Sequence, residues 1–337
     1  MINVSVIGCG RIGQMHCKNI HQSSLFNLVS VYDVNATTIQ QLNSTLQVNI
    51  APSLSAIESN EDLQAVVISS STDTHSDLIE RFTSAGKYVF CEKPLDLDLS
   101  RARHCRDHVM ANGGKVQLGF NRRFDPGHSA MKKQIDDGLI GDLHQVIISS
   151  RDPGMPPKEY LHASGGIFKD MTIHDFDIAR YLLDEEPVEV FATAEALVDP
   201  ELSQEVNDFD TTMVIMKTLS GKMVHINNSR SAVYGYDQRL EAFGSKGMLL
   251  SGNKQENEVQ YFSATNTKAG APYLNFFIER YQEAYFKQFE IFAETIRKGG
   301  EFPVGIEDGY QALLLAETAN RSLAENRPVK VSEVESC

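Results

Sequence analysis

The sequence has no tryptophan, no CxxC pair and no long run of apolar or of basic residues. The missing apolar run excludes a helix that spans a bilayer, since such a helix needs about 20 consecutive apolar residues. The formal net charge is −14, from 31 Lys and Arg against 45 Asp and Glu. This charge disfavours binding to nucleic acid or to an anionic membrane surface. The absence of tryptophan excludes nothing.

Cysteine is scarce, and its spacing matches neither a disulfide framework nor a metal site. The five cysteines are Cys9, Cys17, Cys91, Cys105 and Cys337. We therefore expect reduced thiols, mostly small fillers of the core, in a cytoplasmic protein. A strand predicted from residue 2 leaves no room for a signal peptide, which agrees with that location.

Residues 4–13 read VSVIGCGRIG, a short apolar run that ends in three spaced glycines. The run predicts a buried parallel strand over Ile2–Ile7. Gly8 permits a tight turn, Gly10 lets the backbone approach a pyrophosphate, and Gly13 lets the next helix pack closely on the strand. The helix N-terminus then presents free N–H groups to the phosphates. This context predicts dinucleotide binding. The expected contacts in this loop are Gly8, Gly10, Arg11, Ile12 and Gly13.

An acidic residue, Asp33, follows twenty positions after Gly13 and closes a second predicted strand over Leu28–Tyr32. Its carboxylate can accept hydrogen bonds from ribose hydroxyls of NAD, and it would repel the 2′-phosphate of NADP. Asn35 and Thr37 weaken this preference, because neutral polar groups tolerate a phosphate. No arginine follows Asp33 directly, so NAD is favoured over NADP.

The first 120 residues alternate predicted strands and helices, which is typical of a doubly wound parallel sheet. Further strands are expected there over residues 46–50, 65–69, 88–91 and 115–120. Later segments are longer and alternate apolar with polar residues, which indicates a large, mainly antiparallel sheet. The predicted fold class is α/β, with one domain over residues 1–121 and a second over residues 122–337. The final helix, over about residues 305–325, is expected to pack back on the first domain.

The turn Cys91-Glu92-Lys93-Pro94 follows a predicted strand, at the edge where parallel sheets bind their ligands. Pro94 biases Lys93 toward an extended conformation. A lysine in this place can donate a hydrogen bond to a substrate hydroxyl and stabilise negative charge that develops on its oxygen. The alternative is a solvated lysine beside a turn.

A second segment, residues 165–177, reads GGIFKDMTIHDFD. Its apolar spacing predicts a largely buried helix over about residues 170–183, in which Asp170, His174 and Asp177 share one face. An acid stacked on a histidine orients the imidazole and stabilises its protonated form. That arrangement suits a general base that removes a proton from an alcohol. The alternative is a capping aspartate with a core histidine that it satisfies.

A third segment, residues 121–125, reads NRRFD and follows the last predicted strand of the first domain. Arg122 or Arg123 can bind substrate hydroxyls, brace a domain interface or remain a surface charge, and the sequence does not separate these roles. A metal site on the predicted helix is disfavoured, because its face carries no second histidine and the chain has no cysteine cluster. A serine nucleophile lacks the GxSxG motif.

Four stretches together resemble one known family: the GCGRIG start, the EKP turn, GFNRRFDP and GGIFKDMTIHDFDIARYLL. They look like the glucose–fructose oxidoreductase/inositol dehydrogenase (Gfo/Idh/MocA) family over essentially the whole chain. Residues 149–153 and 164–168 are similar to its inositol 2-dehydrogenase subgroup. The resemblance implies a Rossmann domain, a second domain with an open-faced sheet, and homotetramers that form through that sheet.

The resemblance also implies that Lys93, Asp170 and His174 catalyse an NAD-dependent oxidation of a cyclic polyol, with myo-inositol favoured. His174 takes the hydroxyl proton, Asp170 orients it, and Lys93 binds the reacting oxygen while hydride passes to nicotinamide C4. Residues 154–164 should line the substrate pocket. The implied polyol ligands are Lys93, Asn121, Arg122, Asp170, His174, Asp177 and Tyr236, with Tyr234 as the alternative tyrosine. Further implied cofactor contacts are Ser70, Thr72, His75, Glu92 and Lys93, where Thr72 and His75 have helix capping as their alternative role.

Two other functions remain open at this point. A pocket of Asp, Arg, Lys, His and Tyr suits any vicinal polyol, so another inositol isomer such as scyllo-inositol, or a sugar such as glucose, is the second enzyme hypothesis. A regulator that binds the dinucleotide and a sugar without turnover is the hypothesis from a different class. The presence of both Lys93 and His174 disfavours it, because a sensor needs neither.

Overall fold

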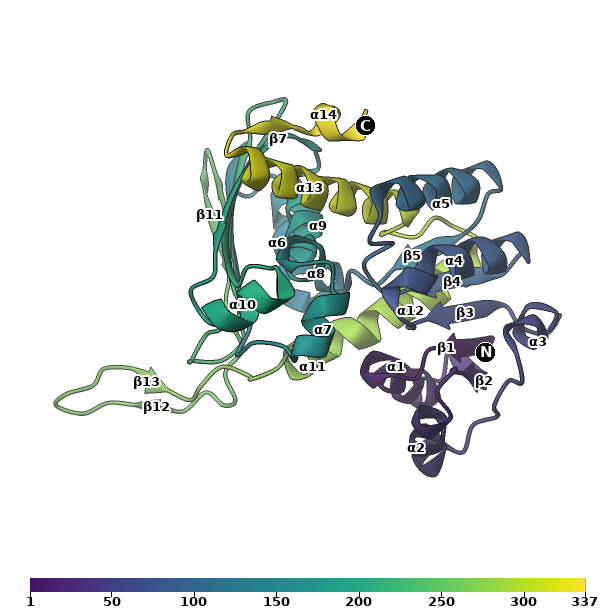
Figure 1. Ribbon diagram of the computed structural model, residues 1–337. Coiled ribbons are helices and arrows are strands. Elements are labelled where there is room, and N and C mark those ends of the chain that lie inside the picture. The colour runs from purple at the N-terminus through teal and green to yellow at the C-terminus, as the bar shows by residue number, and fades with distance from the viewer. Residues whose placement is uncertain (337) are drawn as a thin grey trace. The chain divides into compact units, whose positions relative to one another are not determined.

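The structure, a computed structural model, describes residues 1–336, and Cys337 lies outside the described residues. The chain divides into two compact units, and the first break falls after Asn121. The first unit comprises Met1–Asn121 and Tyr285–Leu313, whereas the second comprises Arg122–Ala284 and the described residues from Leu314 onward (Figure 1). From the sequence we expected Tyr285–Leu313 in the second domain, and it belongs to the first unit instead.

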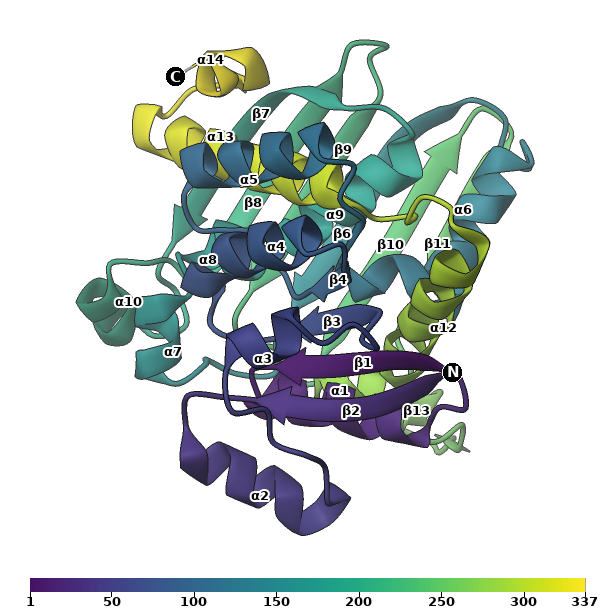
Figure 2. The same cartoon turned by 90° about the vertical axis from the view of Figure 1, so that its right-hand side faces the viewer.

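Five parallel strands form the sheet of the first unit, in the order β2-β1-β3-β4-β5 (Figure 2). Because all of them run the same way, the loops that follow β1, β3 and β4 leave from one edge of the sheet. The strands are β1 (Ile2–Ile7), β2 (Phe26–Tyr32), β3 (Ala65–Ile68), β4 (Tyr88–Cys91) and β5 (Val116–Leu118).

The strand expected over residues 46–50 is wrong. Gln47 takes a left-handed conformation with a φ of 50° and ends the preceding helix. The segment then makes only an isolated parallel bridge, between Ile50 and Val31 of β2. A left-handed residue at a helix end is not extended, so Gln47 cannot belong to a strand. The residues left before Ala51 are too few to form a ladder.

Helices α1 and α12 enclose the apolar core of the first unit. Phe90 of β4 packs against Phe289 and Phe292 of α12, with ring centroids 4.9 and 6.0 Å apart. This packing explains why a helix from the far end of the chain belongs to the first unit. The helices that lie wholly or partly in this unit are α1 (Arg11–Gln22), α2 (Ala36–Leu46), α3 (Leu54–Glu58), η1 (Thr72–Thr74), α4 (His75–Ser84), α5 (Leu99–Ala111), η2 (Asn121–Phe124), α12 (Gln282–Lys298) and α13 (Ile306–Glu325).

A seven-stranded sheet forms the frame of the second unit, in the order β11-β10-β6-β9-β8-β7-β14. Its neighbours pair antiparallel, except for the parallel pair β6 and β9. The short strands at the two edges were not expected from the sequence. The strands are β6 (Leu143–Arg151), β7 (Pro187–Glu195), β8 (Thr211–Thr218), β9 (Met223–Ser229), β10 (Asp237–Gly244), β11 (Gly247–Ser251) and β14 (Val329–Lys330), with a separate hairpin of β12 (Gln260–Tyr261) and β13 (Ala269–Gly270).

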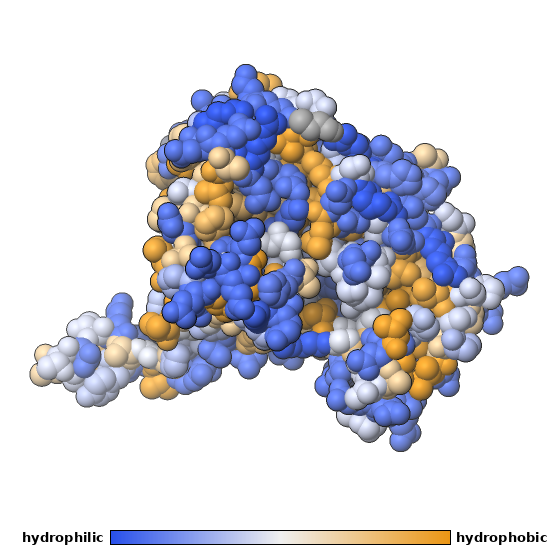
Figure 3. Space-filling view, viewed as in Figure 1, coloured by the Kyte–Doolittle hydropathy of each residue, from blue (hydrophilic) through white to orange (hydrophobic). Residues whose placement is uncertain are grey.

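One face of this sheet is covered by α6, α9 and the last turns of α13, whose apolar side chains share a core with it. The other face carries no helix in Figure 1. Along the edge of this face that is visible in Figure 3, hydrophobic residues lie among hydrophilic ones. The apolar side chains exposed on this open face are Val188, Met213, Ile215, Met223, Phe243, Met248 and Leu250. Besides the last turns of α13, the helices of the unit include α6 (Pro126–Asp136), α7 (Lys158–Ala163), α8 (Ile167–Asp170), α9 (Ile173–Leu183), α10 (Pro200–Val206), α11 (Phe277–Arg280) and α14 (Val331–Glu335).

Among residues 1–336, no helix is both long enough and apolar enough to cross a membrane.

Candidate active site

The glycine loop between β1 and α1 packs tightly at two positions and is open at the third. Gly8 has a φ of 89°, and a Cβ there would collide with the backbone of Ser70. A Cβ on Gly13 would collide with the carbonyl oxygen of Gly8. A Cβ on Gly10 would meet no atom within 4 Å. The loop therefore leaves free space in front of the first N–H groups of α1, which fits the pyrophosphate of a dinucleotide.

Asp33 is tied to this loop by its side chain. The Cys9 N–H donates to Asp33 Oδ2 at 2.6 Å, and the Asn35 N–H donates to Asp33 Oδ1 at 2.7 Å. Each carboxylate oxygen retains a lone pair, so the ribose hydroxyls of NAD can still donate to it. The side chain of Asn35 caps α2 by accepting from the N–H groups of Thr37 and Thr38. Asn35 is therefore engaged in its own helix.

The loop after β3 contains Ser70, Thr72 and His75, all expected at the cofactor. His75 is buried, and its two ring nitrogens face main-chain carbonyls, Nδ1 at 2.8 Å from Pro94 O and Nε2 at 3.2 Å from Ser70 O. Burial lowers the pKa of His75, although those carbonyls oppose the shift. A neutral imidazole carries one N–H, so it can donate to only one of the two carbonyls at a time. His75 thus lies between the main chains of two loops.

Lys93 lies half-buried in the turn after β4, and this turn is joined to both neighbouring strands. The Glu92 N–H donates to the Ile68 carbonyl at 2.9 Å, and the Gly119 N–H donates to the Cys91 carbonyl at 2.7 Å. The backbone that presents Lys93 is therefore held on two sides by the sheet.

The side chain of Glu92 is anchored by a residue that sequence reasoning missed. Glu92 Oε1 lies 2.6 Å from Nε2 of His16, which is fully buried on α1. This contact links the turn that carries Lys93 to the helix that starts at the glycine loop. A histidine one turn after Gly13, among the buried positions of α1, is the signal that would have found it.

The helix expected over residues 170–183 is broken. It consists of α8 and α9, with Met171 and Thr172 between them. The Thr172 N–H bonds to the Ile167 carbonyl, five residues back, at 3.0 Å. The Thr172 hydroxyl donates to Asn228 Oδ1 of β9 at 2.8 Å and so fixes the break. Asp170 therefore ends α8, and His174 lies in the first turn of α9.

Asp170 accepts hydrogen bonds from two residues that were not expected in the site. The Tyr160 hydroxyl donates to Asp170 Oδ1 at 2.6 Å. Arg230 Nη1 donates to Asp170 Oδ2 at 3.1 Å. Arg230 follows β9 and nothing in the sequence around it marks it, whereas Tyr160 falls in the segment that was expected to line the pocket.

His174 lies in the first turn of α9, between two residues that are bonded to the sheet. Asn228 accepts from Thr172 on one side and donates to Asp175 Oδ2 at 2.7 Å on the other. The position of the His174 backbone is thus set by a buried amide of β9.

The two arginines after the first unit form buried ion pairs with α9. Arg122 Nη1 donates to Asp175 Oδ1 at 2.5 Å, and Arg123 donates to both carboxylate oxygens of Asp177. Burial raises the pKa of Asp175, although Arg122 opposes the shift. Arg122 and Asp177 were expected to bind polyol, and the structure gives each a buried partner inside the protein.

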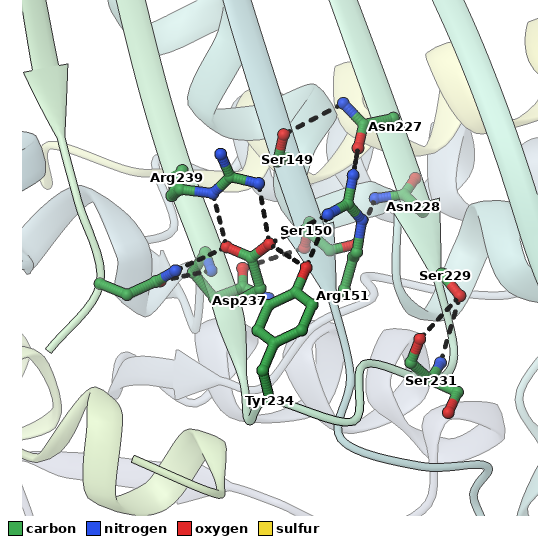
Figure 4. Close-up of polar contacts among 12 residues, drawn as sticks. Ser149, Ser150, Arg151, Asn227, Asn228, Ser229, Ser231, Tyr234, Asp237 and Arg239 are labelled. Carbon is green, nitrogen blue, oxygen red and sulfur yellow. Dashed lines mark hydrogen bonds and ion pairs between the residues drawn. The ribbon is translucent and has the colours of Figure 1, made fainter. Parts of the chain in front are cut away.

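Asn121 and the two candidate tyrosines differ in their surroundings. Asn121 is buried, and its Nδ2 has no hydrogen-bond partner within residues 1–336, so a buried donor is available there. Tyr236 is buried with its ring edge-on to Tyr281, and burial raises its pKa. Tyr234 lies on the open face of the sheet, where its hydroxyl donates to Asp237 at 2.8 Å (Figure 4).

Within the described part of the chain, no group of three or more His, Cys, Asp or Glu side chains is arranged to hold a metal ion.

Both the N-terminal and the C-terminal part of the chain are similar in sequence to known proteins. A model described as an oxidoreductase family with an NAD-binding Rossmann fold matches residues 2–120, and the Gfo/Idh/MocA C-terminal domain matches residues 128–250. The inositol 2-dehydrogenase of Rhizobium meliloti (strain 1021) is 45% identical over 331 residues, which cover 98% of this chain and 99% of that protein. The chain belongs to the Gfo/Idh/MocA oxidoreductase family. Its first unit is accordingly an NAD-binding Rossmann domain.

Other members of the Gfo/Idh/MocA family are similar over the same length. The myo-inositol 2-dehydrogenase of Thermotoga maritima is 41% identical over 334 residues, which cover 99% of each chain. A crystal structure of scyllo-inositol dehydrogenase from Lactobacillus casei, with bound NAD(H) and scyllo-inositol, has a TM-score of 0.91 at 28% identity and covers 98% of this chain and 99% of that one. The predicted family, fold class and oxidoreductase activity are confirmed.

Proposed function

We propose that this protein oxidises myo-inositol to 2-keto-myo-inositol (scyllo-inosose) with NAD as the hydride acceptor. The observation that carries the proposal is the 45% identity, over 98% of the chain, to a protein named inositol 2-dehydrogenase. The open glycine loop, the carboxylate of Asp33 and the expected catalytic residues support it. Lys93, Asp170 and His174 are all present in the sequence.

We assign one chemical role to each of these three side chains. NAD, when bound, accepts a hydride at C4 of its nicotinamide ring. His174 takes the proton of the reacting hydroxyl. The hydrogen on the same carbon then leaves as hydride, with the electron pair of the C–H bond, and the carbon becomes that of a ketone. The Asp170 carboxylate orients the imidazole and stabilises the imidazolium that forms. Lys93 donates a hydrogen bond to the reacting oxygen and stabilises its developing negative charge.

The remaining expected ligands divide into two groups. We assign Asn121 and Tyr236 to the polyol, since Asn121 carries a buried amide donor without a partner in the described chain. Arg122 and Asp177 then support α9 from within, through their ion pairs with Asp175 and Arg123. Ser70, Thr72, His75 and Glu92 stay assigned to the cofactor.

The test is an assay with NAD and a panel of polyols, followed by NADH absorbance at 340 nm. We expect myo-inositol to give the highest kcat/KM, above scyllo-inositol and glucose. A higher kcat/KM with one of these would move the assignment to that substrate. No NADH with any cyclic polyol would contradict the proposal.

The His174→Ala variant separates an enzyme from a regulator. We expect it to lose turnover and to keep its affinity for NADH, because the imidazole acts in proton transfer and not in holding the cofactor. NADH binding is measured by fluorescence titration. A wild-type protein that binds NADH and oxidises nothing would instead be a sensor.

The pH profile tests His174 as the base. Oxidation should rise with pH through the apparent pKa of the imidazole, because only the neutral ring accepts a proton. The measurement is kcat/KM from pH 5 to 9, under conditions where chemistry limits the rate. A flat profile would rule out this assignment.

Asp33 is proposed to select NAD over NADP. The Asp33→Ala variant should bind NAD more weakly and discriminate less against NADP, because the carboxylate that accepts from the ribose and repels the 2′-phosphate is gone. The ratio of kcat/KM values for the two cofactors measures the change. An unchanged ratio would show that Asp33 does not contact the ribose.

We further propose that copies of the chain associate through the open face of the seven-stranded sheet, within a homotetramer. The exposed apolar side chains share this face with Arg151 and Arg239, which are partly exposed and pair with the buried Asp237. An exposed apolar face of this kind suits a symmetric contact between copies. Light scattering should give four times the chain mass. Met213→Lys should lower it, whereas Met110→Lys, at an equally exposed methionine of α5, should not. A mass unaffected by Met213→Lys would exclude this face.

We also propose a reducing compartment, the cytoplasm, for this protein. The four cysteines of the described chain, Cys9, Cys17, Cys91 and Cys105, are all buried and free. Buried thiols without disulfide partners are typical of cytosolic proteins.

A further inference from the structure

We propose that Arg230 and Tyr160 are positioning residues that hold the Asp170 carboxylate ionised and in one orientation, and so set the proton affinity of the His174 base. The inference rests on the proposed function for its kinetic test. Its geometry lies within the second unit and stands on two hydrogen bonds, one to each oxygen of Asp170. We name this arrangement, formed by Arg230, Asp170 and Tyr160, the Asp170 clamp.

Arg230 is the fixed side of the Asp170 clamp. Its side chain is 0% exposed, and it is the largest fully buried side chain in the structure. Burying a charge without partners is costly, so a guanidinium in this place needs carboxylates around it. Burial lowers the pKa of Arg230, but Asp170, Asp208 and Asp152 outweigh it and the net pKa is raised. Arg230 is therefore a permanent cation beside Asp170.

Asp208 holds Arg230 and the start of α8 at the same time. Arg230 Nη2 lies 3.4 Å from Asp208 Oδ2, and the Ile167 N–H donates to Asp208 Oδ1 at 3.0 Å. Asp170 lies at the other end of the same short helix. The guanidinium is thus linked to both ends of α8, directly to Asp170 and through Asp208 to Ile167. These links fix the position of the Asp170 carboxylate.

Tyr160 is the outer side of the Asp170 clamp. It lies on α7 and is 48% exposed, and its hydroxyl donates to Asp170 Oδ1 at 2.6 Å. Burial of the phenol oxygen and the charge of Asp170 raise the pKa of Tyr160, so it keeps its proton and acts as a donor. A hydrogen bond donated to a carboxylate favours its anionic form.

Two donors on one carboxylate have a consequence for proton transfer. An ionised Asp170 makes protonation of a nearby base easier, and a protonated Asp170 does not. Because the proposed function pairs Asp170 with His174, a positive charge next to the pair should lower its apparent pKa, and removal of that charge should raise it. The charged or titratable groups that face the Asp170 clamp from the elements packed around it include Tyr160 on α7, Asp208 after α10, Asp152 after β6 and Arg230 after β9.

The decisive experiment compares the pH profile of kcat/KM for polyol oxidation in wild type, Arg230→Gln and Arg230→Lys. The acid limb of this profile is the range at low pH over which kcat/KM rises as the base loses its proton. We expect Arg230→Gln to move the acid limb to higher pH by about one unit. We expect it to lower kcat on the order of 10- to 100-fold, since small displacements of a positioned group have effects of that size. Arg230→Lys keeps the charge and should keep the limb closer to its original pH. NADH affinity should stay unchanged in both variants.

A matched control removes another buried arginine of the same unit. Arg180 on α9 pairs with Glu186, so Arg180→Gln takes away a charge without touching the Asp170 clamp. It should leave the acid limb in place. A loss of melting temperature and kcat in Arg230→Gln with no shift of the limb would mean a purely structural arginine, and would overturn the proposal.

Tyr160→Phe keeps the proposal testable if Arg230→Gln does not fold, because Tyr160 is half-exposed. We expect a smaller shift of the acid limb in the same direction and a severalfold lower kcat. Tyr261→Phe, at an exposed tyrosine of β12, is its control and should behave as wild type. An unchanged profile in Tyr160→Phe would remove Tyr160 from the clamp.

A titration without turnover separates this inference from the proposed function. The ring signal of His174, assigned with His174→Gln in protein labelled at histidine, gives its apparent pKa directly by NMR. We expect a higher apparent pKa in Arg230→Gln than in wild type. This shift in a protein that oxidises no polyol would support the clamp and refute the function. An active wild type whose His174 pKa does not respond to Arg230→Gln would refute the clamp alone.

Discussion

At the scale of single residues, buried polar side chains hold the expected catalytic groups in place. His16 lies among aromatic rings, with ring centroids 5.0 Å from Phe289 and 5.5 Å from Phe90. Its Nδ1 has no hydrogen-bond partner within residues 1–336. The contact of Nε2 with Glu92 is therefore the hydrogen bond that holds this buried ring.

Removing this hydrogen bond should loosen the turn that carries Lys93. We expect His16→Leu to lower stability by about 1.5–3 kcal/mol, the range for a hydrogen bond to a charged group, and to lower kcat. His16→Gln keeps an N–H and should recover part of both losses. Thermal unfolding and steady-state kinetics measure the change. Ile20→Val, a buried change on the same helix, should lower stability slightly without lowering kcat.

At the scale of elements, the loop between β1 and α1 contains glycines with opposite requirements. A side chain at Gly13 meets the backbone of Gly8, whereas a side chain at Gly10 meets open space. Gly13 therefore serves the fold, and Gly10 serves the ligand. The same scale shows why local spacing misled us at α8 and α9, where a hydroxyl of the break bonds to a distant strand.

This difference predicts two distinct phenotypes. Gly13→Ala should lower the melting temperature strongly, because helix and strand cannot approach as closely. Gly10→Ala should keep the melting temperature of wild type and weaken NADH binding tenfold or more, since its methyl group occupies the space for the pyrophosphate. Thermal unfolding and NADH titration distinguish the two. Equal NADH affinity in Gly10→Ala and wild type would show that the pyrophosphate lies elsewhere.

At the scale of the whole molecule, buried histidines make stability depend on pH. His128 is buried on α6, and burial lowers its pKa to about 4. In the unfolded chain a histidine takes its proton near pH 6.5. Between these two values the unfolded state binds more protons, so the free energy of unfolding decreases as the pH falls from about 6.5 to about 4.

Denaturant unfolding at several pH values measures this effect. The His128→Gln variant should reduce the slope between pH 6.5 and 4 by up to about 1.4 kcal/mol per pH unit, because one titrating group is gone. The slope is the readout, since the substitution also alters the packing. His144→Gln, at an exposed histidine, should leave the slope unchanged. A slope equal to that of wild type in His128→Gln would show that His128 is protonated in the folded state.

Local patterns were enough for the parts of the fold that depend on neighbours in the chain. The apolar run of β1, the three glycines and the alternation of β6 each carry their own signal, because strand burial and turn geometry are local requirements. The bounds of β1 and β4 agree with those expected. The acid at the end of β2 followed from its spacing to the glycines.

The sequence by itself determined the fold class and the family, and it singled out Lys93, Asp170 and His174 as the proposed catalytic residues, since these depend on residue types and spacing along the chain. The tertiary structure alone decided their support: His16 under Glu92, Asn228 beside His174, and the return of α12 to the first sheet. Arg230 reaches Asp170 from 60 positions away. Such contacts form because a buried polar group takes whatever partner the packed fold brings near, and no local pattern encodes that choice.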